Sequence, residues 1–465
     1  MAKNDFIMSS FNLTPDQIHT LDPVLINGIY HIRTTLNTDS AACPFCGGKS
    51  VSHGFKKRVY NHLPLFGYPS VIEWNRHRFK CKDCQKTFME PNPFGPENYH
   101  CTYAVLNSVM RDLRNIHYTY KDIAEKHRIS EALVRLYADS FIQAPRLTLP
   151  ESLGMDEIHS KLAKYGGSYI AVLVDNVHRS LLDILPNRSK RTLSKYFETI
   201  PLEERKRVRY VTIDFWEPYK DVALKYLPNA RICGDPFHVV KHLGEGFSRI
   251  RVDIMNQSVY NSPEYYLLKK WHRLLETDCT LDNTPKYNNY FRKKMNYRDL
   301  YNMLLNLNPD LTKAYQLKEM YRTFNKNCTF AEAPAQLDSL IQAFEAADLY
   351  CYREFVEMLK KWRPEIINSF ERPFDDRKQS NALAEHCNSR LRELLAVSNG
   401  YANFERFRAK ALFCLNNHIF YSLTHILDSK KRQGKPRGTY NKQMVAITDL
   451  PGNDVDSMDQ DFEDE

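Results

Sequence analysis

Two pairs of cysteines place the strongest constraint on how this chain can fold. The first pair lies in C-P-F-C and the second in C-K-D-C, with residues 47–80 between them; the four are Cys43, Cys46, Cys81 and Cys84. Four thiolates at this spacing can bring two tight turns face to face and close a tetrahedral zinc site. Because such a site leaves no coordination position for water, the pattern predicts a structural zinc ion.

Three other residues are alternative ligands by residue type, namely His62, His77 and Cys101. Gly47 and Gly48 directly follow the first cysteine pair. A metal-binding turn needs a positive φ at this point, which glycine adopts without strain. The glycines therefore favour the four-cysteine set.

The composition agrees with a globular protein of a reducing compartment. Of 465 residues, 43% are hydrophobic and 26% charged, which excludes a collagen, a disulfide-dense miniprotein and a wholly disordered chain. The N-terminus lacks the apolar core of a signal peptide, which predicts a reducing compartment. The eleven cysteines of the chain are therefore expected to bind metal rather than form disulfides. No apolar run is long enough to span a bilayer. We therefore expect a cytoplasmic protein.

The charges are unevenly distributed. Lys and Arg number 65 and Asp and Glu 56, so the formal net charge is +9. Seven of the acids and no bases lie between Asp454 and Glu465, which leaves about sixteen net positive charges on the rest of the chain. Such an excess favours a polyanionic partner, and charge alone fits either nucleic acid or a membrane surface.

The residue composition and the spacing of apolar residues change along the chain and divide it into six parts. The stretch between Gly246 and Gly400 contains no glycine, and isolated prolines punctuate it at helix-length intervals, which predicts an all-helical insertion. The predicted parts are a zinc-binding domain (1–100), a helix-turn-helix DNA-binding domain (101–147), a part with alternating β-runs and helices (148–245), the helical insertion (246–375), further helices (376–428) and a basic, then acidic tail expected to be disordered (429–465). The family resemblance described below implies that 148–245 and 376–428 are the first part and the C-terminal helices of one catalytic core.

Short β-rich runs alternate with amphipathic segments between residues 150 and 250. The runs cover residues 153–158, 169–174, 181–185, 208–213 and 231–233. Two hairpin-linked strands, a third strand and then strand–helix–strand units predict a mixed sheet flanked by helices. The expected fold class is therefore multidomain α/β.

The segment from Thr119 to Phe141 has the pattern of two helices joined by a tight turn. Ala124 allows the helices to cross closely, and Ser130 can cap the second helix. That helix would present three residues toward the major groove of DNA, namely Glu131, Ala132 and Arg135. An ordinary helical hairpin shows the same pattern, so both interpretations stay open.

Two aspartates lie on or at the end of buried β-runs, where an unpaired charge is costly. Asp156 lies in the first run, and Asp214 directly follows the fourth. If these strands are parallel neighbours, they lie about 4.8 Å apart, and both carboxylates can share divalent cations. A later helix carries Asn381, Glu385, Asn388 and Arg392 on one face. The residues alone do not select these acids, because Glu157, Asp175 and Asp183 also lie on or beside β-runs.

The order of the blocks resembles the ISL-three family of bacterial insertion-sequence transposases, which are DDE-type enzymes. CPFCGGKSVSHGFKKR and RFKCKDCQKTF resemble its zinc-binding segment, and GMDEI resembles the segment with its first catalytic aspartate. VTIDFWEPYKDVALKYLPNARICGDPFHVVKHL resembles the strand of the second aspartate followed by a D-x-x-H element, here Asp235 and His238. SNALAEHCNSRLRELL resembles the block with the catalytic glutamate. The resemblance extends from Cys43 to about Leu412.

The resemblance implies an RNase H-like core whose helical insertion precedes the helix that bears the glutamate. It assigns Asp156, Asp214 and Glu385 to two catalytic Mg²⁺ or Mn²⁺ ions. Four further residues are expected to support this site or contact DNA, namely Asp235, His238, Asn388 and Arg392. The implied partners are terminal inverted repeats and target DNA, bound by a homodimer or larger synaptic assembly in the bacterial cytoplasm.

The chain departs from the family pattern at three positions. His386 stands where glycine is expected after the glutamate, and Leu395 and Ala396 stand where a basic pair is common. Two other functions fit part of the pattern. A non-catalytic DNA-binding regulator would bind DNA without nicking it, and another RNase H-like nuclease would cut DNA without joining strands. The complete set of three acids favours the transposase.

Overall fold

The computed structural model describes residues 13–38, 41–97, 99–164, 167–277, 280–398 and 400–421. The tail predicted to be disordered (429–465) lies outside these ranges. Among the described residues, no helix combines the length and apolar character that crossing a membrane requires.

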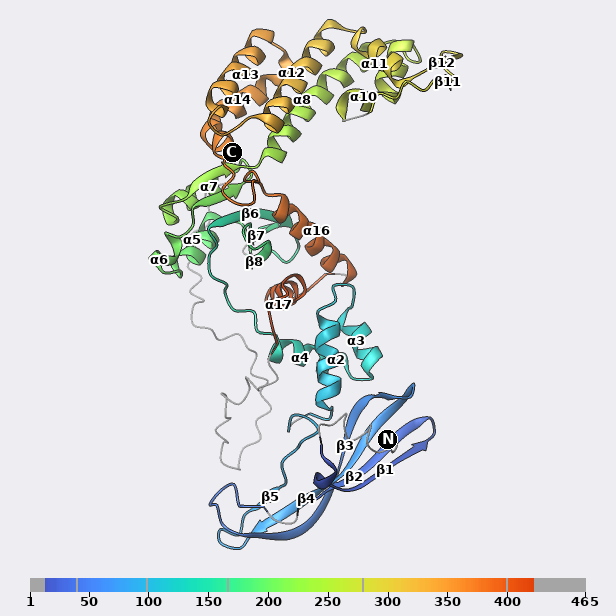
Figure 1. The fold of residues 1–465 in the computed structure, drawn as a ribbon, viewed down its shortest axis with the longest axis vertical. Helices are drawn as coiled ribbons and strands as arrows, with labels where there is room; N and C mark the ends of the chain where they lie inside the picture. Colours follow the sequence, from blue (N-terminus) through green and yellow to red (C-terminus); the bar gives the residue numbers. More distant parts are fainter. Residues whose placement is uncertain are drawn as a thin grey trace, which may run out of the picture. The chain divides into compact units, whose positions relative to one another are not determined.

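A five-stranded sheet forms the N-terminal part of the chain (Figure 1). After the short 3₁₀ helix η1 (Pro15–Gln17), the strands are β1 (Ile18–Ile26), β2 (Ile29–Leu36), β3 (Ser50–Leu65), β4 (Tyr68–Cys81) and β5 (Thr87–Met89). Their order is β1-β2-β4-β3, with β5 paired to β4, and only β2 and β4 run parallel. Asn27-Gly28 and Phe66-Gly67 have positive φ at both residues, as tight two-residue hairpin turns require.

Three helices follow this sheet. They are α2 (Tyr103–Leu113), α3 (Tyr120–His127) and α4 (Glu131–Phe141). Each begins at a residue whose hydroxyl accepts a backbone N–H bond, respectively Thr102, Thr119 and Ser130. The prediction of two helices broken once between Thr119 and Phe141 is confirmed, and Arg128 in the left-handed region ends α3. Their buried faces share one apolar cluster.

The central part is a mixed sheet flanked by helices, as predicted. Its strands are β6 (Ser152–His159), β7 (Tyr169–Asp175), β8 (Ser180–Leu185), β9 (Tyr210–Ile213) and β10 (Arg231–Gly234), in the order β10-β9-β6-β7-β8. β6, β7 and β8 pair antiparallel, whereas β9 runs parallel to both β6 and β10. All five predicted β-runs are therefore strands of one sheet.

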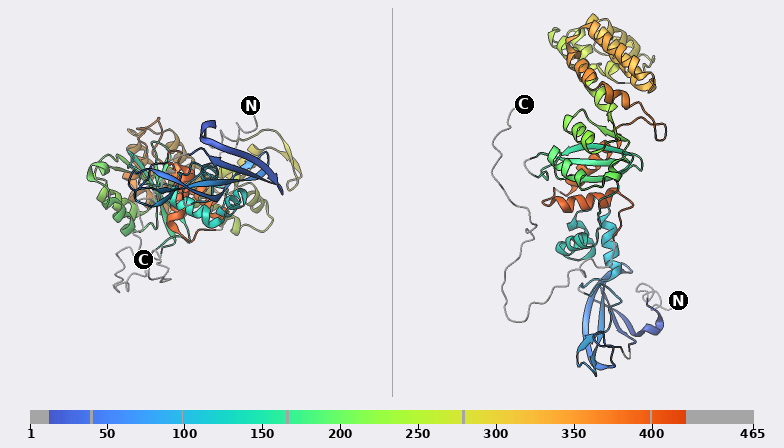
Figure 2. Two further views of the ribbon diagram at one scale, coloured as in Figure 1. Left: turned by 90° about the horizontal axis from the view of Figure 1, so that it is seen from below. Right: turned by 90° about the vertical axis from the view of Figure 1, so that its left-hand side faces the viewer.

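Helices cover both faces of this sheet (Figure 2). Leu153, Met155 and Leu173 belong to the apolar cluster that contains residues of α5 (Lys190–Glu198) and α7 (Glu217–Tyr226). Val172 and Val174 belong to the cluster on the other side, with α16 (Ala382–Val397) and α17 (Phe404–Leu415). Successive side chains of β7 thus enter opposite layers, which explains why its run is almost entirely apolar. The short helix α6 (Leu202–Arg205) precedes β9.

Between β10 and α16 the chain is mainly helical. The helices are α8 (Pro236–Gln257), α9 (Pro263–Lys270), α10 (Arg273–Glu276), α11 (Tyr297–Leu305), α12 (Pro309–Asn327), α13 (Ala333–Ala347), η2 (Tyr350–Tyr352), α14 (Arg353–Lys361) and α15 (Arg363–Asn368). A proline stands in the first turn of five of them, where its missing N–H costs nothing. α8 runs continuously across residues 245 and 246, where we placed a domain boundary.

The prediction that the insertion is all-helical is wrong at one place. The strands β11 (Lys286–Asn288) and β12 (Lys293–Met295) pair antiparallel and form a hairpin. The side-chain Oδ1 of Asn288 accepts the backbone N–H groups of Tyr290 and Phe291, and Arg292 adopts φ 48°. These local bonds favour a turn over a helix at this point.

Candidate active site and zinc site

Three aspartates form a row across three neighbouring parallel strands: Asp156 lies within β6, whereas Asp214 and Asp235 directly follow β9 and β10. Met155 of β6 pairs with Ile213 of β9, and Ile213 pairs with Gly234 of β10. The next residue along each chain segment is an aspartate: Asp156, Asp214 and Asp235. The prediction that the segments of Asp156 and Asp214 are parallel neighbours is confirmed.

The side chain of Asp156 is almost completely buried, and the residue is only 5% exposed. Its Oδ2 accepts a hydrogen bond from Asn388 Nδ2 (2.7 Å), and its Oδ1 accepts the backbone N–H of Glu157 (2.7 Å). Burial, followed by the negative charge of Asp214, raises the pKa of Asp156 to about 8. Without a cation nearby, this carboxyl group is therefore mostly protonated at neutral pH.

Asp214 is tied to Asp235 through the imidazole of His238. His238 Nε2 lies 3.2 Å from Asp214 Oδ2, and His238 Nδ1 lies 3.0 Å from Asp235 Oδ2. Burial alone would lower the pKa of His238, but the hydrogen bond to Asp235 and the charge of Asp214 outweigh it and raise the pKa. Burial raises the pKa of Asp214 to about 6, although the charge of His238 opposes this rise.

Asp235, like Asp214, has a protein partner at each carboxylate oxygen, but the two residues differ in burial. Oδ1 accepts the backbone N–H of Asn381 (3.1 Å), and Oδ2 is bonded to His238. The residue is fully buried, whereas the side chain of Asp214 is 19% exposed. This geometry favours a supporting role for Asp235 and leaves Asp214 accessible to a ligand.

Asn381 connects α16 to the aspartate row. Its Nδ2 donates to the carbonyl oxygen of Met155 (2.9 Å) and to Asp214 Oδ1 (3.3 Å), and its Oδ1 accepts from Thr212 Oγ1 (2.7 Å). The side chain has no exposed surface, and the residue stands directly before the first turn of the helix. The start of α16 is thereby held against β6 and β9.

The other polar residues of this helix face are placed differently from one another. Glu385 is half-buried, and its charge contributes to the raised pKa of Asp156, so it acts on the same site. Asn388 is buried against Asp156, as its hydrogen bond shows. Arg392 is exposed and has no ion-pair partner among the described residues.

Two residues of the site were not among the sequence-based candidates. Thr212, in β9, bonds Asn381, and the hydroxyl of Tyr219 in α7 donates to the carbonyl oxygen of Asp156 (3.1 Å). Both are completely buried. A buried threonine or tyrosine carries no distinctive spacing, so one sequence offers no signal for either.

The donor set suits divalent cations. Carboxylate oxygens are hard ligands of the kind that Mg²⁺ and Mn²⁺ prefer. Burial and, to a smaller extent, neighbouring carboxylates raise the pKa of Asp156 and of Asp214, and a bound cation would stabilise the ionised form of both groups. Oδ1 of Asn388, beside Asp156, is buried without a hydrogen-bond partner in the described part of the chain. Asp214, Asp235 and His238 each offer one possible ligand atom, and these three atoms lie within 4.8 Å of one another.

A largely basic cavity of about 680 Å³ adjoins the start of α16. It is lined by the β7–β8 turn, the end of α12, the segment 372–380 and the first turns of α16. Its charged lining consists of Arg179, Lys326, Arg372, Asp376, Arg377, Lys378 and His386. His386, the residue that replaces the expected glycine, is exposed here. A cavity with this charge suits phosphate groups.

The four cysteines of the N-terminal part converge as predicted. The Sγ atoms of Cys43 and Cys84 are 3.6 Å apart, those of Cys46 and Cys81 are 3.5 Å apart, and all four lie within 4.8 Å of one another. A tetrahedron with Zn–S bonds of about 2.3 Å has edges of about 3.8 Å. The donor set therefore fits zinc.

The alternative ligands lie outside this cluster. His62 is bonded to Thr102 and His77 to Ser52, and Cys101 is buried elsewhere. Gly47 has φ 75°, as the turn requires. A Cβ atom on Gly48 would lie 1.9 Å from Asp83 Oδ2, so a larger residue at this position would require the exposed side chain of Asp83 to move.

The three residues expected to contact DNA lie in the first turns of α4. Ala132 and Arg135 are exposed, and Glu131 is half-exposed. Arg135 forms an ion pair with Glu131 (2.7 Å), and both side chains are more than 40% exposed, so DNA phosphates can compete for the arginine.

Comparison with known proteins gives consistent matches. Residues 153–411 match the transposase family model of the ISL3 class with a DDE domain, and residues 39–84 match the zinc finger of transposases IS204/IS1001/IS1096/IS1165. The transposase for insertion sequence element IS1001 of Bordetella parapertussis is 25% identical over 378 residues, 79% of this chain and 87% of the relative. The transposase for insertion sequence element IS1557 of Mycobacterium tuberculosis is 23% identical over 305 residues, 62% and 66% of the two chains.

Proposed function

The chain belongs to the ISL3 family of DDE-type insertion-sequence transposases, and we propose that it binds the terminal inverted repeats of its own element, cuts the DNA there and joins the end to target DNA. In the cut, a water oxygen bonds to phosphorus, the bond to the 3′ oxygen breaks, and a 3′-hydroxyl is released. In the joining step, that hydroxyl loses its proton and bonds to a target phosphorus, which breaks one backbone bond of the target.

Asp156, Asp214 and Glu385 are the proposed catalytic residues. When bound, two Mg²⁺ or Mn²⁺ ions would activate the attacking oxygen and stabilise the leaving one. The observation that carries this assignment is the row of aspartates on parallel strands, against which the start of α16 is held. The pKa values of Asp156 and Asp214 in this row are both raised. Perturbed carboxyl groups gathered at one place are typical of catalytic sites.

His238, Asp235 and Asn381 are proposed to position Asp214. The hydrogen bonds from His238 and Asn381 orient the two carboxylate oxygens, and the hydrogen bond to buried Asp235 raises the pKa of His238 against the effect of burial. Asn388 orients Asp156 in the same way. We assign no role to Arg392 beyond a DNA contact.

The core around these residues is proposed to be RNase H-like. Three antiparallel strands followed by two parallel ones, with helices on both faces, support this class. The proposed domain ranges are 1–100, 101–147, 148–245, 246–375, 376–428 and 429–465.

Sequence recognition is proposed for α4 through Arg135, Glu131 and Ala132, with α3 and α4 acting as a helix-turn-helix. The basic cavity beside α16 would hold the DNA backbone near the cutting site. A homodimer or larger assembly would bring two ends together.

The proposal is tested by cleavage of labelled end DNA with Mg²⁺ or Mn²⁺, alongside a binding assay on the same DNA. Asp156→Asn, Asp214→Asn and Glu385→Gln keep the side-chain size but remove the charge that binds metal. Each should abolish cutting and strand joining while end binding survives. If all three variants still cut, the metal-binding assignment is wrong.

The structure selects the matched control. Asp175 accepts the backbone N–H groups of Val177 and His178, which the amide oxygen of Asp175→Asn can still accept, so this variant should keep substantial activity. Asp183 is a poor control because it is buried in an ion pair with Arg408.

Asp235→Asn tests the choice of the second metal ligand. If Asp235→Asn is inactive yet binds DNA while Asp214→Asn still cuts, the second ligand has been placed on the wrong strand.

A further inference from the structure

The β11–β12 hairpin carries a concentrated positive charge. Residues 286–295 read KYNNYFRKKM and contain four cations and no acid. Arg292, Lys293 and Lys294 are exposed, and none has an ion-pair partner within the described ranges. We call these three residues the hairpin patch. Lys286, the fourth cation, lies against the ring of Tyr297.

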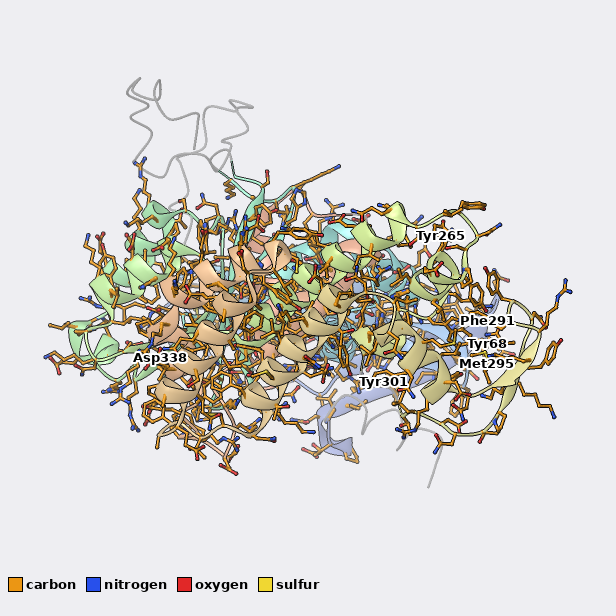
Figure 3. All side chains as sticks on the ribbon, turned by 90° about the horizontal axis from the view of Figure 1, so that it is seen from above. Tyr68, Tyr265, Phe291, Met295, Tyr301 and Asp338 are labelled. Atoms are coloured by element: carbon orange, nitrogen blue, oxygen red, sulfur yellow. The ribbon has the colours of Figure 1, made fainter. Side chains whose placement is uncertain are left out.

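The hairpin packs against the neighbouring helix α9 through aromatic side chains. Figure 3 labels Phe291 and Met295 of the hairpin region and Tyr265 of α9. The ring of Tyr290 stacks on Tyr266 with centroids 4.1 Å apart and planes 8° apart, and Phe291 packs edge-on against both. The hydroxyl of Tyr266 also donates to Asn288 Oδ1 (3.2 Å). Met295 is buried at the opposite end of β12.

Nearby acids do not neutralise the hairpin patch. Asp282 accepts the backbone N–H of Thr284, and Asp299 accepts that of Asn296, so each is used to shape its own turn or helix start. A rigid element with unpaired cations attracts a polyanion and loses little conformational freedom on binding it. The exposed ring of Tyr287, 62% accessible, lies on the neighbouring strand.

We propose that the β11–β12 hairpin binds the phosphate backbone of duplex DNA. A two-stranded ribbon has the width that the major groove admits, and lysine and arginine on such a ribbon reach the phosphates that border it. This inference rests on the proposed function, because it assumes that the chain's polyanionic partner is DNA. It adds a contact that lies in the insertion and is independent of α4 and of the catalytic acids.

The test is the salt dependence of DNA binding by the full-length protein. The slope of log K against log salt is negative, and each lost phosphate contact reduces its magnitude by about 0.9. The variant Arg292→Ala/Lys293→Ala/Lys294→Ala should therefore reduce the magnitude by about 2.7. The affinity deficit of this variant should then be about 40-fold larger at 50 mM than at 200 mM salt. Each single variant should reduce the magnitude by about 0.9, which gives the same test with a smaller change.

A matched control removes the same charge elsewhere in the insertion. Lys313, Arg353 and Lys360 are exposed, and the last two form surface ion pairs that contribute little to stability. Their triple alanine variant should keep the wild-type slope, and Lys293→Arg/Lys294→Arg should do so as well. Equal losses in the hairpin and control variants would overturn the proposal, since they would reflect net charge alone.

Two duplexes of equal length, one with the terminal repeat and one with scrambled sequence, complete the design. An equal drop in slope on both is expected, because phosphate contacts carry no sequence information. A drop confined to the repeat would overturn the backbone contact. If the wild type cuts end DNA and the hairpin variant has an unchanged slope, this inference fails while the proposed function stands. If the wild type binds neither duplex, both fail.

Discussion

The buried carboxyl group of Asp156 should make the protein without divalent cations less stable as the pH rises. The folded-state pKa is about 8 against an ordinary value of 3.8, so folding favours the protonated form. The stability that this proton contributes is fully present below pH 3.8 and is lost as the pH rises through 8. Asp156→Asn cannot ionise and should escape this loss.

The expected size follows from the number of protons involved. Between pH 5 and pH 7 the folded wild type holds one more proton at Asp156 than the unfolded chain does, which corresponds to about 1.4 kcal/mol per pH unit. Relative to Asp156→Asn, the wild type should therefore lose about 2.7 kcal/mol across this interval. The amide oxygen of the variant can keep only one of the two bonds that Asp156 accepts, from Asn388 or from the backbone N–H of Glu157, so the test compares the pH slopes of the two proteins rather than their absolute stabilities.

The assay is a urea series at several pH values, read by hydrogen exchange on peptides from β6. Magnesium is omitted rather than chelated, since a chelator would also strip the cysteine site. Saturating Mg²⁺ should restore stability to the wild type, by about 2.7 kcal/mol at a hundredfold excess over its Kd, and should leave the variant unchanged. Parallel pH profiles for the two proteins would refute the reasoning, because they would mean that Asp156 is not held protonated by burial.

Three further substitutions test other parts of the molecule. Cys81→Ser should release about one zinc per chain, measured by metal analysis, and unfold mainly the first hundred residues; a zinc-free wild type would contradict the site. Gly48→Ala should weaken zinc retention in a chelator competition, because the new methyl group clashes with Asp83, and Gly48→Ala/Asp83→Ala should recover part of it. Arg135→Ala should cost about 1–3 kcal/mol of end binding and relax sequence preference, whereas unchanged footprints would rule out α4 as the reading element.

Features that depend on neighbouring residues were readable from the sequence. The four zinc ligands followed from cysteine spacing, because two short turns determine which atoms can reach one ion. The five strands of the central sheet followed from apolar runs, because burial on both faces requires nearly continuous hydrophobic residues. The helix N-cap at Ser130 was also predictable, because its hydroxyl bonds a backbone N–H only three residues later. The choice of Asp156, Asp214 and Glu385 among many acids came from family resemblance, because spacing alone does not distinguish them from other acids beside β-runs.

Tertiary structure decided what local pattern could not. Only the register of β6, β9 and β10 places three aspartates in one row, and only the packing of the whole fold shows that Asp235 is fully buried whereas Asp214 is partly exposed. Asn381 reaches two strands more than 160 residues earlier, a contact that no spacing rule encodes. The three-residue strands of the β11–β12 hairpin are too short for any periodicity and are held in place by packing against α9. Sequence patterns report the interactions of a residue with its neighbours along the chain, whereas the site and the hairpin exist through contacts made across the fold.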